Sequence, residues 1–485
     1  MTNNKKLKII HVASEVDPFS KTGGLADVIR SLPKAQKRLG HEVAIITPLY
    51  KRVVDIKKHG LKMIEKDIKV QINSQDIVKV NFYKGYLMPG LPVYFIENTK
   101  YFSKRKTLYG STHENARFMV FDVACLRLLA MLDFKPNIIH CHDWHTGLIP
   151  YYLRTNFHYA KKLKKAKTVY TIHNLAFQMG QNWWNVPLKY KDYGTSKLPR
   201  LGEKKIEYIN FAKRAILTAD VINTVSERYA EEILTKKFGQ DLHHILKNRR
   251  HKLFGIINGI DYRAYNPYTD PGLRKKYNTN TVSLKKINKN HLQKKFNLAI
   301  NTNVPIITMT SRIAFQKGFS LFNKILDKIL RLNVQIIVMG DGSKEYVSTL
   351  KKYQRKFPKK IIWIPFDKKV ETSMYAGGDF FLLPSQYEPC GLNQMVAMRY
   401  GCIPIVHYVG GLFDTVNDYD TATNSGNGFV FKNFDSYELY GAIIRALEIY
   451  KNKKRWRALL IRAMRESNSW ELPAKKYIDL YRRAN

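Results

Sequence analysis

Cysteine is scarce in this 485-residue sequence, which has only Cys125, Cys141, Cys390 and Cys402. None of them forms a C-x-x-C pair, and such sparse cysteine favours a reducing compartment over a disulfide-rich secreted scaffold. Long hydrophobic runs are also missing, because no apolar stretch approaches the roughly 20 residues of a membrane-spanning helix. The first residues resemble neither a secretory signal nor an acid-free transit peptide. We therefore expect no structural disulfide, no membrane span and a cytoplasmic location.

Acidic residues are few as well: 39 Asp and Glu stand against 82 Lys and Arg, giving a formal net charge of +43. Such a charge attracts polyanions, and nucleic acid is the first of these to consider. The lysines are scattered through almost every segment, however, and no aromatic-basic motif typical of RNA-binding domains accompanies them. With 45% hydrophobic and 12% aromatic residues, the chain can bury a large core. We expect about two or three globular domains and do not expect nucleic acid as a partner.

Short β-branched apolar runs alternate with longer amphipathic segments, a rhythm typical of parallel α/β sheets. Five such runs lie in the first half of the chain, at 9–12, 43–47, 138–141, 168–172 and 221–225. Five more follow an irregular stretch at 255–303, and they lie at 305–310, 335–339, 361–364, 380–383 and 403–406. The sequence therefore predicts two α/β domains. Ligands of such sheets bind beyond the carboxyl ends of the strands, and two facing sheets would place the best site in the cleft between them.

A glycine-rich loop follows the first predicted strand and leads into a helix-like run at 28–39. Lys21, Gly23 and Gly24 lie in this loop. Glycine lets the backbone approach an anion closely, free N–H groups at a helix start favour negative charge, and Lys21 adds a mobile cation. The spacing matches neither a P-loop nor a G-x-G-x-x-G fingerprint. The loop is therefore a candidate phosphate site, and a tight structural turn is the alternative.

Two cations, Arg312 and Lys317, stand five positions apart on the loop that follows the predicted strand 305–310. Paired cations at a strand end suit a diphosphate, because each can neutralise one phosphate group. A solvated surface pair is the alternative.

The segment after the predicted strand 380–383 is the most informative part of the sequence. Its proline, next to Glu388, restricts the backbone, so the carboxylate can be held to accept hydrogen bonds from adjacent sugar hydroxyls. The N–H groups of Cys390, Gly391 and Leu392 would then open a helix toward an anion. The alternative is a proline-containing loop that only starts a helix.

Two acidic or histidine-rich clusters look like metal sites. His140, His142, Asp143 and His145 alternate along a strand end and its loop, without the spacing of a helical zinc motif. Asp418 and Asp420 form a D-x-D in a polar loop, which favours a solvent-facing turn. We expect no metal at either place.

At this point the chain resembles, nearly end to end, the bacterial glycogen synthases and plant starch synthases that use nucleotide-diphosphate glucose. The motifs that carry the resemblance occur in family order: KTGGLADV at 21–28, HCHDWH at 140–145, TIHN at 171–174, NGID at 258–261, SR at 311–312 with QKG at 316–318, and EPCGL at 388–392. Together they are far more specific than any one of them.

The resemblance implies a GT-B type fold, with two facing Rossmann-like domains and an active site in the interdomain cleft. The implied parts are an acceptor-side domain at 1–256, a nucleotide-sugar-binding domain at 257–466, and a C-terminal segment at 467–485 that crosses back to the first domain. The implied reaction transfers glucose from ADP-glucose to glycogen or another α-1,4-glucan, with retention at the anomeric carbon. It needs no metal or other cofactor and involves no membrane.

The same resemblance implies a role for each matching residue. Lys21, Arg312 and Lys317 would neutralise the departing diphosphate, and Glu388 would hold donor-sugar hydroxyls. His173, Asp143 and Asn258 would line the reacting glucose. The expected catalytic residues are thus Lys21, Asp143, His173, Arg312, Lys317 and Glu388, and the expected substrate-binding residues are Gly23, Gly24, Asn258, Cys390, Gly391 and Leu392. The chain departs from the family pattern at four positions: it has Asp241 where glycine is usual, Ser320 where aspartate is usual, His407 where arginine is usual, and Phe366 where an aromatic hydroxyl is usual.

Three alternatives remain beside this prediction. The donor could be UDP-glucose, or the protein could be an inactive glucan-binding relative, which should have lost some of the leaving-group cations that are all present here. An epimerase or a phosphorylase on a similar architecture would carry its own signature, and no pyridoxal-phosphate lysine segment is apparent.

Overall fold

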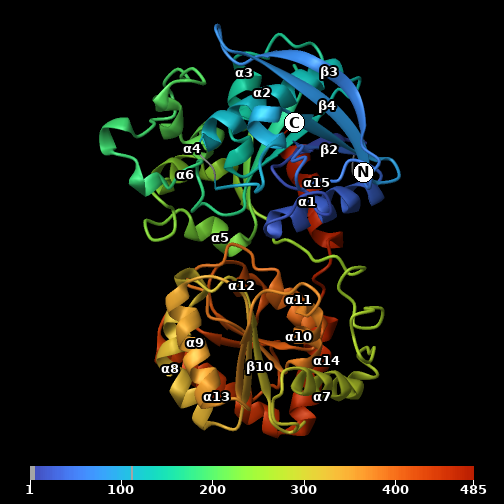
Figure 1. The fold of residues 1–485 in the computed structure, drawn as a ribbon, viewed down its shortest axis with the longest axis vertical. Helices are drawn as coiled ribbons and strands as arrows, with labels where there is room; N and C mark the ends of the chain where they lie inside the picture. The colour runs from blue at the N-terminus through green and yellow to red at the C-terminus, as the bar shows by residue number, and fades with distance from the viewer. Residues whose placement is uncertain (1–5, 111–112, 485) are drawn as a thin grey trace. The chain divides into compact units, whose positions relative to one another are not determined.

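The computed structural model describes residues 6–110 and 113–484. The chain divides into two compact units: Met1–Ile256 together with Trp470–Asn485, and Ile257–Ser469 (Figure 1). The second unit thus ends at Ser469, where the sequence analysis placed its end at residue 466. The C-terminal segment, expected from residue 467, accordingly begins at Trp470, and its last residue, 485, lies outside the described residues.

A nine-stranded sheet in the order β3-β4-β5-β2-β1-β6-β7-β8-β9 forms the centre of the first unit. From β5 to β9 each neighbouring pair is parallel, whereas β3, β4 and β5 pair antiparallel at one edge. The strands are β1 Lys8–Val12, β2 Glu42–Pro48, β3 Lys62–Gln71, β4 Ile77–Met88, β5 Leu91–Glu97, β6 Ile138–His142, β7 Lys167–Ile172, β8 Val221–Thr224 and β9 Leu253–Gly255.

Helices cover both faces of the parallel strands in this unit, which explains why those strands are continuous apolar runs. On one face, Ile9 of β1 and Ile138 of β6 pack into a cluster with Leu32 of α1 and with Tyr477 and Tyr481 of α15. The C-terminal helix α15 (red) lies beside α1 (blue) in Figure 1, and the two helices are in contact. The helices of the unit are α1 Gly24–Arg38, α2 Glu114–Met131, α3 Ile149–Arg154, α4 Phe211–Thr218, α5 Glu227–Glu232, α6 His243–Asn248 and α15 Glu471–Ala484.

The second unit contains a six-stranded, fully parallel sheet in the order β12-β11-β10-β13-β14-β15. Its strands are β10 Ile306–Thr310, β11 Gln335–Met339, β12 Ile361–Ile364, β13 Phe380–Leu383, β14 Ile403–His407 and β15 Phe429–Phe431. Its helices are α7 Lys285–Lys295, α8 Phe319–Arg331, α9 Lys344–Lys356, α10 Glu371–Gly377, α11 Asn393–Arg399, α12 Gly410–Thr415, α13 Ser436–Lys451 and α14 Lys453–Arg465. Each strand from β10 to β14 alternates with a helix, as parallel pairing requires.

All ten predicted strands are present, with ends that differ by no more than two residues. The prediction of an irregular stretch at 255–303 is partly wrong, because helix α7 lies within it. Its sequence, KKINKNHLQKK, carries few apolar residues, and amphipathic periodicity is the signal by which a helix is found. Strands β3, β4, β5, β9 and β15 also escaped prediction. Strand β3 is largely exposed and rich in charge, and β9 and β15 have only three residues each.

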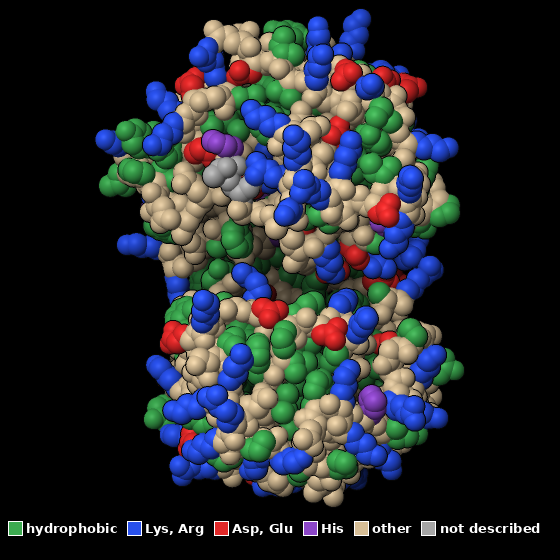
Figure 2. Space-filling model, viewed as in Figure 1, with side chains coloured by type: hydrophobic (Ala, Val, Ile, Leu, Met, Phe, Trp, Pro, Cys, Tyr) green, Lys and Arg blue, Asp and Glu red, His purple; other side chains and the backbone are tan. Residues whose placement is uncertain are grey.

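The positive charge is spread over the face of the molecule that Figure 2 shows. In Figure 2, Lys and Arg side chains cover the visible face of each unit without gathering into one patch, and acidic side chains are sparse. All four cysteines belong to the described residues, and they are buried and free. Of the helices in the described ranges, none has the length and hydropathy to span a membrane.

Candidate functional site

The glycine-rich loop joins β1 to α1 in the first unit. Gly23 precedes the first residue of α1, Gly24 begins the helix, and Lys21 is ion-paired with Asp27. Glu15 holds the loop in place, since its Oε2 accepts hydrogen bonds from the backbone N–H of Thr22 at 2.5 Å and from the Thr22 hydroxyl at 2.8 Å. Burial raises the pKa of Glu15 to about 7. Sequence analysis gave Glu15 no role in this site, although it follows a strand end in the same way as the residues that were chosen.

Asp143 and His173 lie at the carboxyl ends of β6 and β7. Asp143 has a positive φ of 58°, which turns the chain away from the strand direction. Its Oδ1 accepts the backbone N–H of His173 at 2.8 Å and that of Asn174 at 3.4 Å. Burial raises the pKa of Asp143 to about 7, against the opposing effect of these two hydrogen bonds. The carboxyl group therefore fixes the backbone at the start of the His173 loop.

The His173 ring is bonded to a second histidine, with its Nε2 2.9 Å from Nδ1 of His142. Burial lowers the pKa of His173 to about 3, so the ring is neutral at neutral pH. The structure thus brings Asp143, His142 and His173 together, with the backbone of His173 held by one partner and its ring by the other.

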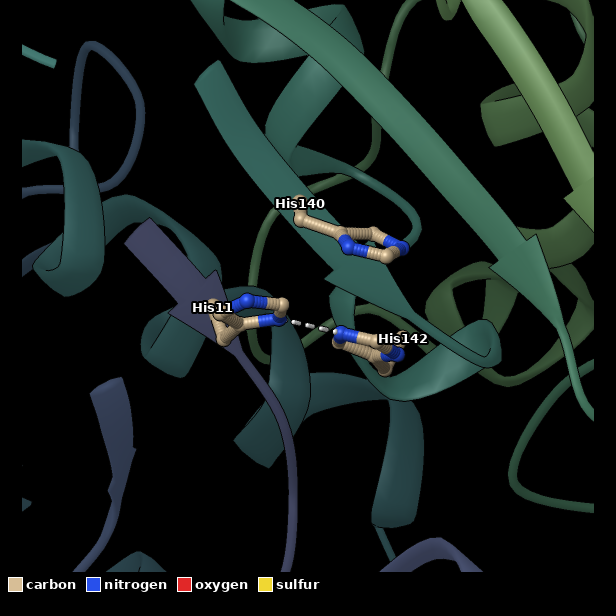
Figure 3. A group of neighbouring side chains, drawn as sticks. All are labelled: His11, His140 and His142. Atoms are coloured by element: carbon tan, nitrogen blue, oxygen red, sulfur yellow. Dashed lines mark hydrogen bonds between the residues drawn. The ribbon is translucent and has the colours of Figure 1, made fainter. Parts of the chain in front are cut away.

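Sequence analysis grouped His140, His142 and His145, but the structure separates them. His140 and His142 lie on one face of the sheet with His11 of β1, which the sequence analysis missed (Figure 3). Candidate ligand atoms of these three side chains lie within 4.8 Å of one another. His145 packs elsewhere, against Tyr109 and Phe118. Both ring nitrogens of His11, His140 and His142 already have hydrogen-bond partners.

In the second unit, the loop after β10 meets the loop after β13. Lys317 Nζ lies 2.5 Å from Glu388 Oε2, and the Ser385 hydroxyl donates to the same oxygen at 3.0 Å. Gln316 links the loops again, because its side-chain Nε2 donates to Tyr387 O at 3.3 Å and its backbone carbonyl accepts the N–H of Gln386 at 2.8 Å. The structure therefore brings the predicted lysine and carboxylate into direct contact.

Arg312 is more loosely held and stands on the same loop. Its Nη2 lies 3.5 Å from Gln316 Oε1, at the outer limit of a hydrogen bond. This leaves most of its guanidinium group available to an anion. Gln316 had no assigned role in the sequence analysis, yet it contacts both Arg312 and the Glu388 loop.

Glycines allow the strand-end loops of this unit to touch. A Cβ on Gly318 would lie 1.9 Å from Pro384 O, and one on Gly411 would lie 2.0 Å from Cys390 O. Gly410 is likewise packed against the backbone of Glu388, and the N–H of Gly411 donates to Glu388 O at 3.0 Å. Three glycine positions thus hold the Glu388 loop from two sides.

Asn258 and Cys390 contact each other beside this loop. Burial raises the pKa of the Cys390 thiol to about 12, and hydrogen bonds from Asn258 oppose that rise. Within the described ranges, no group hydrogen bonds the buried Oδ1 of Asn258. Gly391 adopts a left-handed φ of 69°, and Leu392 precedes the first residue of α11. Asn258, Cys390, Gly391 and Leu392 therefore lie close to Glu388, as expected of one binding surface.

The D-x-D pair lies in a surface turn of the second unit. Asp418 is ion-paired with Arg445 at 3.0 Å and accepts the N–H of Val430. Asp420 accepts hydrogen bonds from Thr423 and Ala422 of its own turn. These contacts occupy the two carboxylates with structural partners.

His407 and Phe366, two of the departures from the family pattern, also lie in this unit. His407 is buried and its Nδ1 lies 2.7 Å from Ser385 O, next to the Glu388 loop. Phe366 is half exposed, with 51% of its surface accessible.

Comparison with known proteins agrees with this geometry. The model of the starch synthase catalytic domain matches residues 8–248, and that of glycosyl transferases group 1 matches residues 291–458. The chain is 40% identical to a glycogen synthase of Desulforamulus reducens, over 98% of both chains. It is also 40% identical to one of Thermotoga petrophila, over 99% of both chains.

Solved structures give the same result. The catalytic domain of starch synthase IV from Arabidopsis thaliana, bound to ADP and acarbose, is 31% identical over 99% of both chains, with a TM-score of 0.87. A sucrose-phosphate synthase from Thermosynechococcus elongatus, 17% identical with a TM-score of 0.62, shares the fold. The two α/β units are therefore those of a GT-B glycosyltransferase, and the chain belongs to the glycogen synthase and starch synthase family of hexosyltransferases.

Proposed function

We propose that this protein transfers glucose from ADP-glucose to the non-reducing end of an α-1,4-glucan such as glycogen, with retention of the anomeric configuration. The contact between Lys317 and Glu388, with Arg312 on the same loop as Lys317, is the observation that supports the proposal most strongly. Two cations and a carboxylate thus follow the carboxyl ends of parallel strands, where ligands of such sheets bind, which supports the proposal.

The chemistry of the donor explains why these residue types suit the reaction. Breaking the bond between glucose and a diphosphate develops positive charge at the anomeric carbon and negative charge on the leaving oxygens. Arg312 and Lys317 would stabilise the leaving diphosphate, because fixed cations in a water-poor site need no reorganisation during the reaction. We propose no metal cofactor, since these side chains can supply the charge that a divalent cation supplies in other transferases.

Glu388 would accept hydrogen bonds from hydroxyls of the donor sugar once the diphosphate draws Lys317 toward it. Asn258, Cys390, Gly391 and Leu392 would form the rest of that surface, and the free Oδ1 of Asn258 is an acceptor suited to a hydroxyl. In the first unit, Gly23 and Gly24 would offer backbone N–H groups to a phosphate. Asp143 and His173 would line the reacting glucose.

The proposal requires Lys21 of the first unit to act on the same donor as Lys317 of the second. A double-mutant cycle tests this requirement without reference to geometry. If both lysines stabilise one leaving group, the effects of Lys21→Ala and Lys317→Ala on kcat/KM will not be additive. Strict additivity would assign the two residues to separate steps or separate ligands.

One experiment tests the reaction and the donor together. Purified protein is incubated with glycogen and labelled ADP-glucose or UDP-glucose, with and without a chelator, and glucan incorporation is measured. We expect incorporation from ADP-glucose that the chelator does not change. Faster incorporation from UDP-glucose would reassign the donor, and chelator sensitivity would contradict the metal-free proposal. The absence of incorporation from either donor would favour an inactive glucan-binding relative.

A further inference from the structure

A buried row of polar side chains in the first unit has no role in the proposed reaction. His11 of β1, His142 of β6, Thr171 of β7 and Asn223 of β8 follow one another across the sheet and are fully buried. Strand register pairs His11 with His140, His142 with Thr171, and Thr171 with Asn223. These residues share one face, which α1 and α15 cover. Their hydrogen bonds connect the C-terminal helix with His173.

Asn223 fixes one end of this row. Its Nδ2 donates to the carbonyl oxygens of Thr224 at 3.0 Å and Phe254 at 3.1 Å, so its Oδ1 must face Thr171. The Thr171 hydroxyl, 3.0 Å away, therefore donates its single proton to Oδ1. Thr171 Oγ1 is then the acceptor for His140 Nε2 at 2.6 Å. His140 consequently carries its proton on Nε2.

The same direction of proton donation continues through side chains of α15 and α1. His140 Nδ1, which has no proton, accepts the hydroxyl of Tyr481 at 2.7 Å. Having donated that proton, the Tyr481 oxygen accepts Nε2 of Gln36 at 3.0 Å. This contact orients the Gln36 amide, so its Oε1 faces His11 Nε2 at 2.7 Å and accepts a proton from it. His11 therefore carries its proton on Nε2 as well.

Two further steps reach the candidate site. His11 Nδ1 accepts from Nε2 of His142 at 3.0 Å, the contact drawn in Figure 3. His142 Nδ1 then accepts from Nε2 of His173 at 2.9 Å. Burial lowers the pKa of all four histidines, to about 4 for His11 and about 3 for His173. Each neutral ring has one N–H and one lone pair, so the direction set at Asn223 is transmitted without ambiguity.

We propose that this chain of hydrogen bonds holds His173 in its neutral Nε2–H form and leaves the Nδ1 lone pair as an acceptor for a glucose hydroxyl. Among the described residues none hydrogen bonds this Nδ1, and the residue is only half buried. A neutral acceptor suits the place, because a protonated ring would repel positive charge developing at the reacting carbon. His11, Gln36, His142 and Tyr481 are thus positioning residues, and their role in turnover rests on the proposed function.

The tautomer is measured directly by ¹⁵N NMR of the full-length protein labelled at histidine. The His173 signals are identified by their loss in a His173→Asn variant. We expect the wild-type ring to be protonated on Nε2. In Tyr481→Phe, the Gln36 amide loses the hydroxyl that orients it. Both directions of proton donation then become accessible, and His173 should show a mixture of tautomers.

Tyr477→Phe is the matched control, since it removes a hydroxyl from the same face of α15. The Tyr477 hydroxyl donates to Asn223 Oδ1 at 2.9 Å, but Thr171 still donates there, so the direction of the chain is unchanged. The His173 spectrum of this variant should equal that of the wild type. A wild-type ring protonated on Nδ1, or equal spectra for the two tyrosine variants, would overturn the proposal. If Tyr481→Phe does not fold, Gln36→Met breaks the chain from α1 and is judged by the same criterion.

Turnover provides a second readout. Tyr481→Phe should lower kcat roughly 3- to 10-fold, as expected for the loss of one correctly directed hydrogen bond. KM for ADP-glucose should stay close to the wild-type value, and Tyr477→Phe should keep its kcat. A wild-type protein without transferase activity would refute the proposed function, and the NMR comparison would still decide the tautomer. Equal losses of kcat in the two tyrosine variants would show that these hydrogen bonds have only a structural role.

Discussion

Lys317 Nζ contacts Glu388 Oε2 at 2.5 Å, and the two residues come from loops that follow different strands of one sheet. In this state the lysine neutralises the carboxylate expected to grip the sugar. A diphosphate would compete for the same ammonium group, because it carries more negative charge. Donor binding would therefore free the Glu388 oxygen for hydroxyl groups as it recruits the lysine.

Replacing Lys317 by alanine should lower kcat by a hundredfold or more, about 3 kcal/mol, because the leaving diphosphate loses a fixed cation. Incorporation of labelled glucose into glycogen measures the effect. Lys324→Ala is the control, since Lys324 is exposed on the adjoining helix α8. The kcat of Lys324→Ala should be close to that of the wild type. A Lys317→Ala enzyme with nearly normal turnover would remove this residue from the mechanism.

Gly411→Ala should destabilise the second unit by about 1–3 kcal/mol and impair transfer, because the added Cβ would meet Cys390 O. Gly441→Ala should instead stabilise by about 0.5–1 kcal/mol, since Gly441 lies within helix α13 with open space around it. Chemical denaturation and the incorporation assay measure both variants. If Gly411→Ala raised the free energy of unfolding as Gly441→Ala does, the Glu388 loop would tolerate a shift of its backbone, contrary to this prediction.

Asp122→Asn should improve stability at alkaline pH relative to the wild type. Asp122 is fully buried and accepts the N–H of Leu148 at 2.9 Å, and burial raises its pKa well above 3.8. A raised folded-state pKa stabilises the protein below the unfolded pKa, and this stability is lost as pH rises toward the folded value. Asparagine cannot ionise and avoids the loss.

The measurement compares thermal unfolding of the Asp122→Asn variant and the wild type at several pH values from 5 to 9. The difference in Tm should move in favour of the variant as pH rises. Asp133→Asn, at an exposed position, should show no such trend. A difference between Asp122→Asn and wild type that is the same at every pH would contradict the assignment.

Truncation after Ser469 should destabilise the first unit, although the removed helix is distant in sequence. Ala474, Tyr477, Ile478 and Tyr481 of α15 belong to the buried cluster of that unit. Their loss would expose the apolar face of α1 and leave polar groups such as His140 Nδ1 without partners. The truncated protein should unfold at lower denaturant concentration, or fail to fold. An unchanged midpoint would show that α15 adds nothing to the core.

Ten of the parallel strands could be predicted because burial on both faces makes them continuous apolar runs, whereas β5 and the three-residue strands β9 and β15 were missed. The antiparallel edge could not, since β3 carries charged residues on an exposed face. In the site, Lys317 and Glu388 were found because both follow strand ends in a recognisable motif. Glu15 and Gln316 were missed because they hold the loops partly through backbone groups, and such contacts leave no pattern in the sequence. The link from His11 to His173 needed strand register as well as motif.

The assignment of Trp470–Asn485 to the first unit has a consequence for biosynthesis. Residues 6–256 are translated before the whole second unit, yet α15, the helix that completes the core of the first unit, is translated only after the second unit. The uncovered apolar surface of α1 must therefore be kept from aggregating until α15 has been translated.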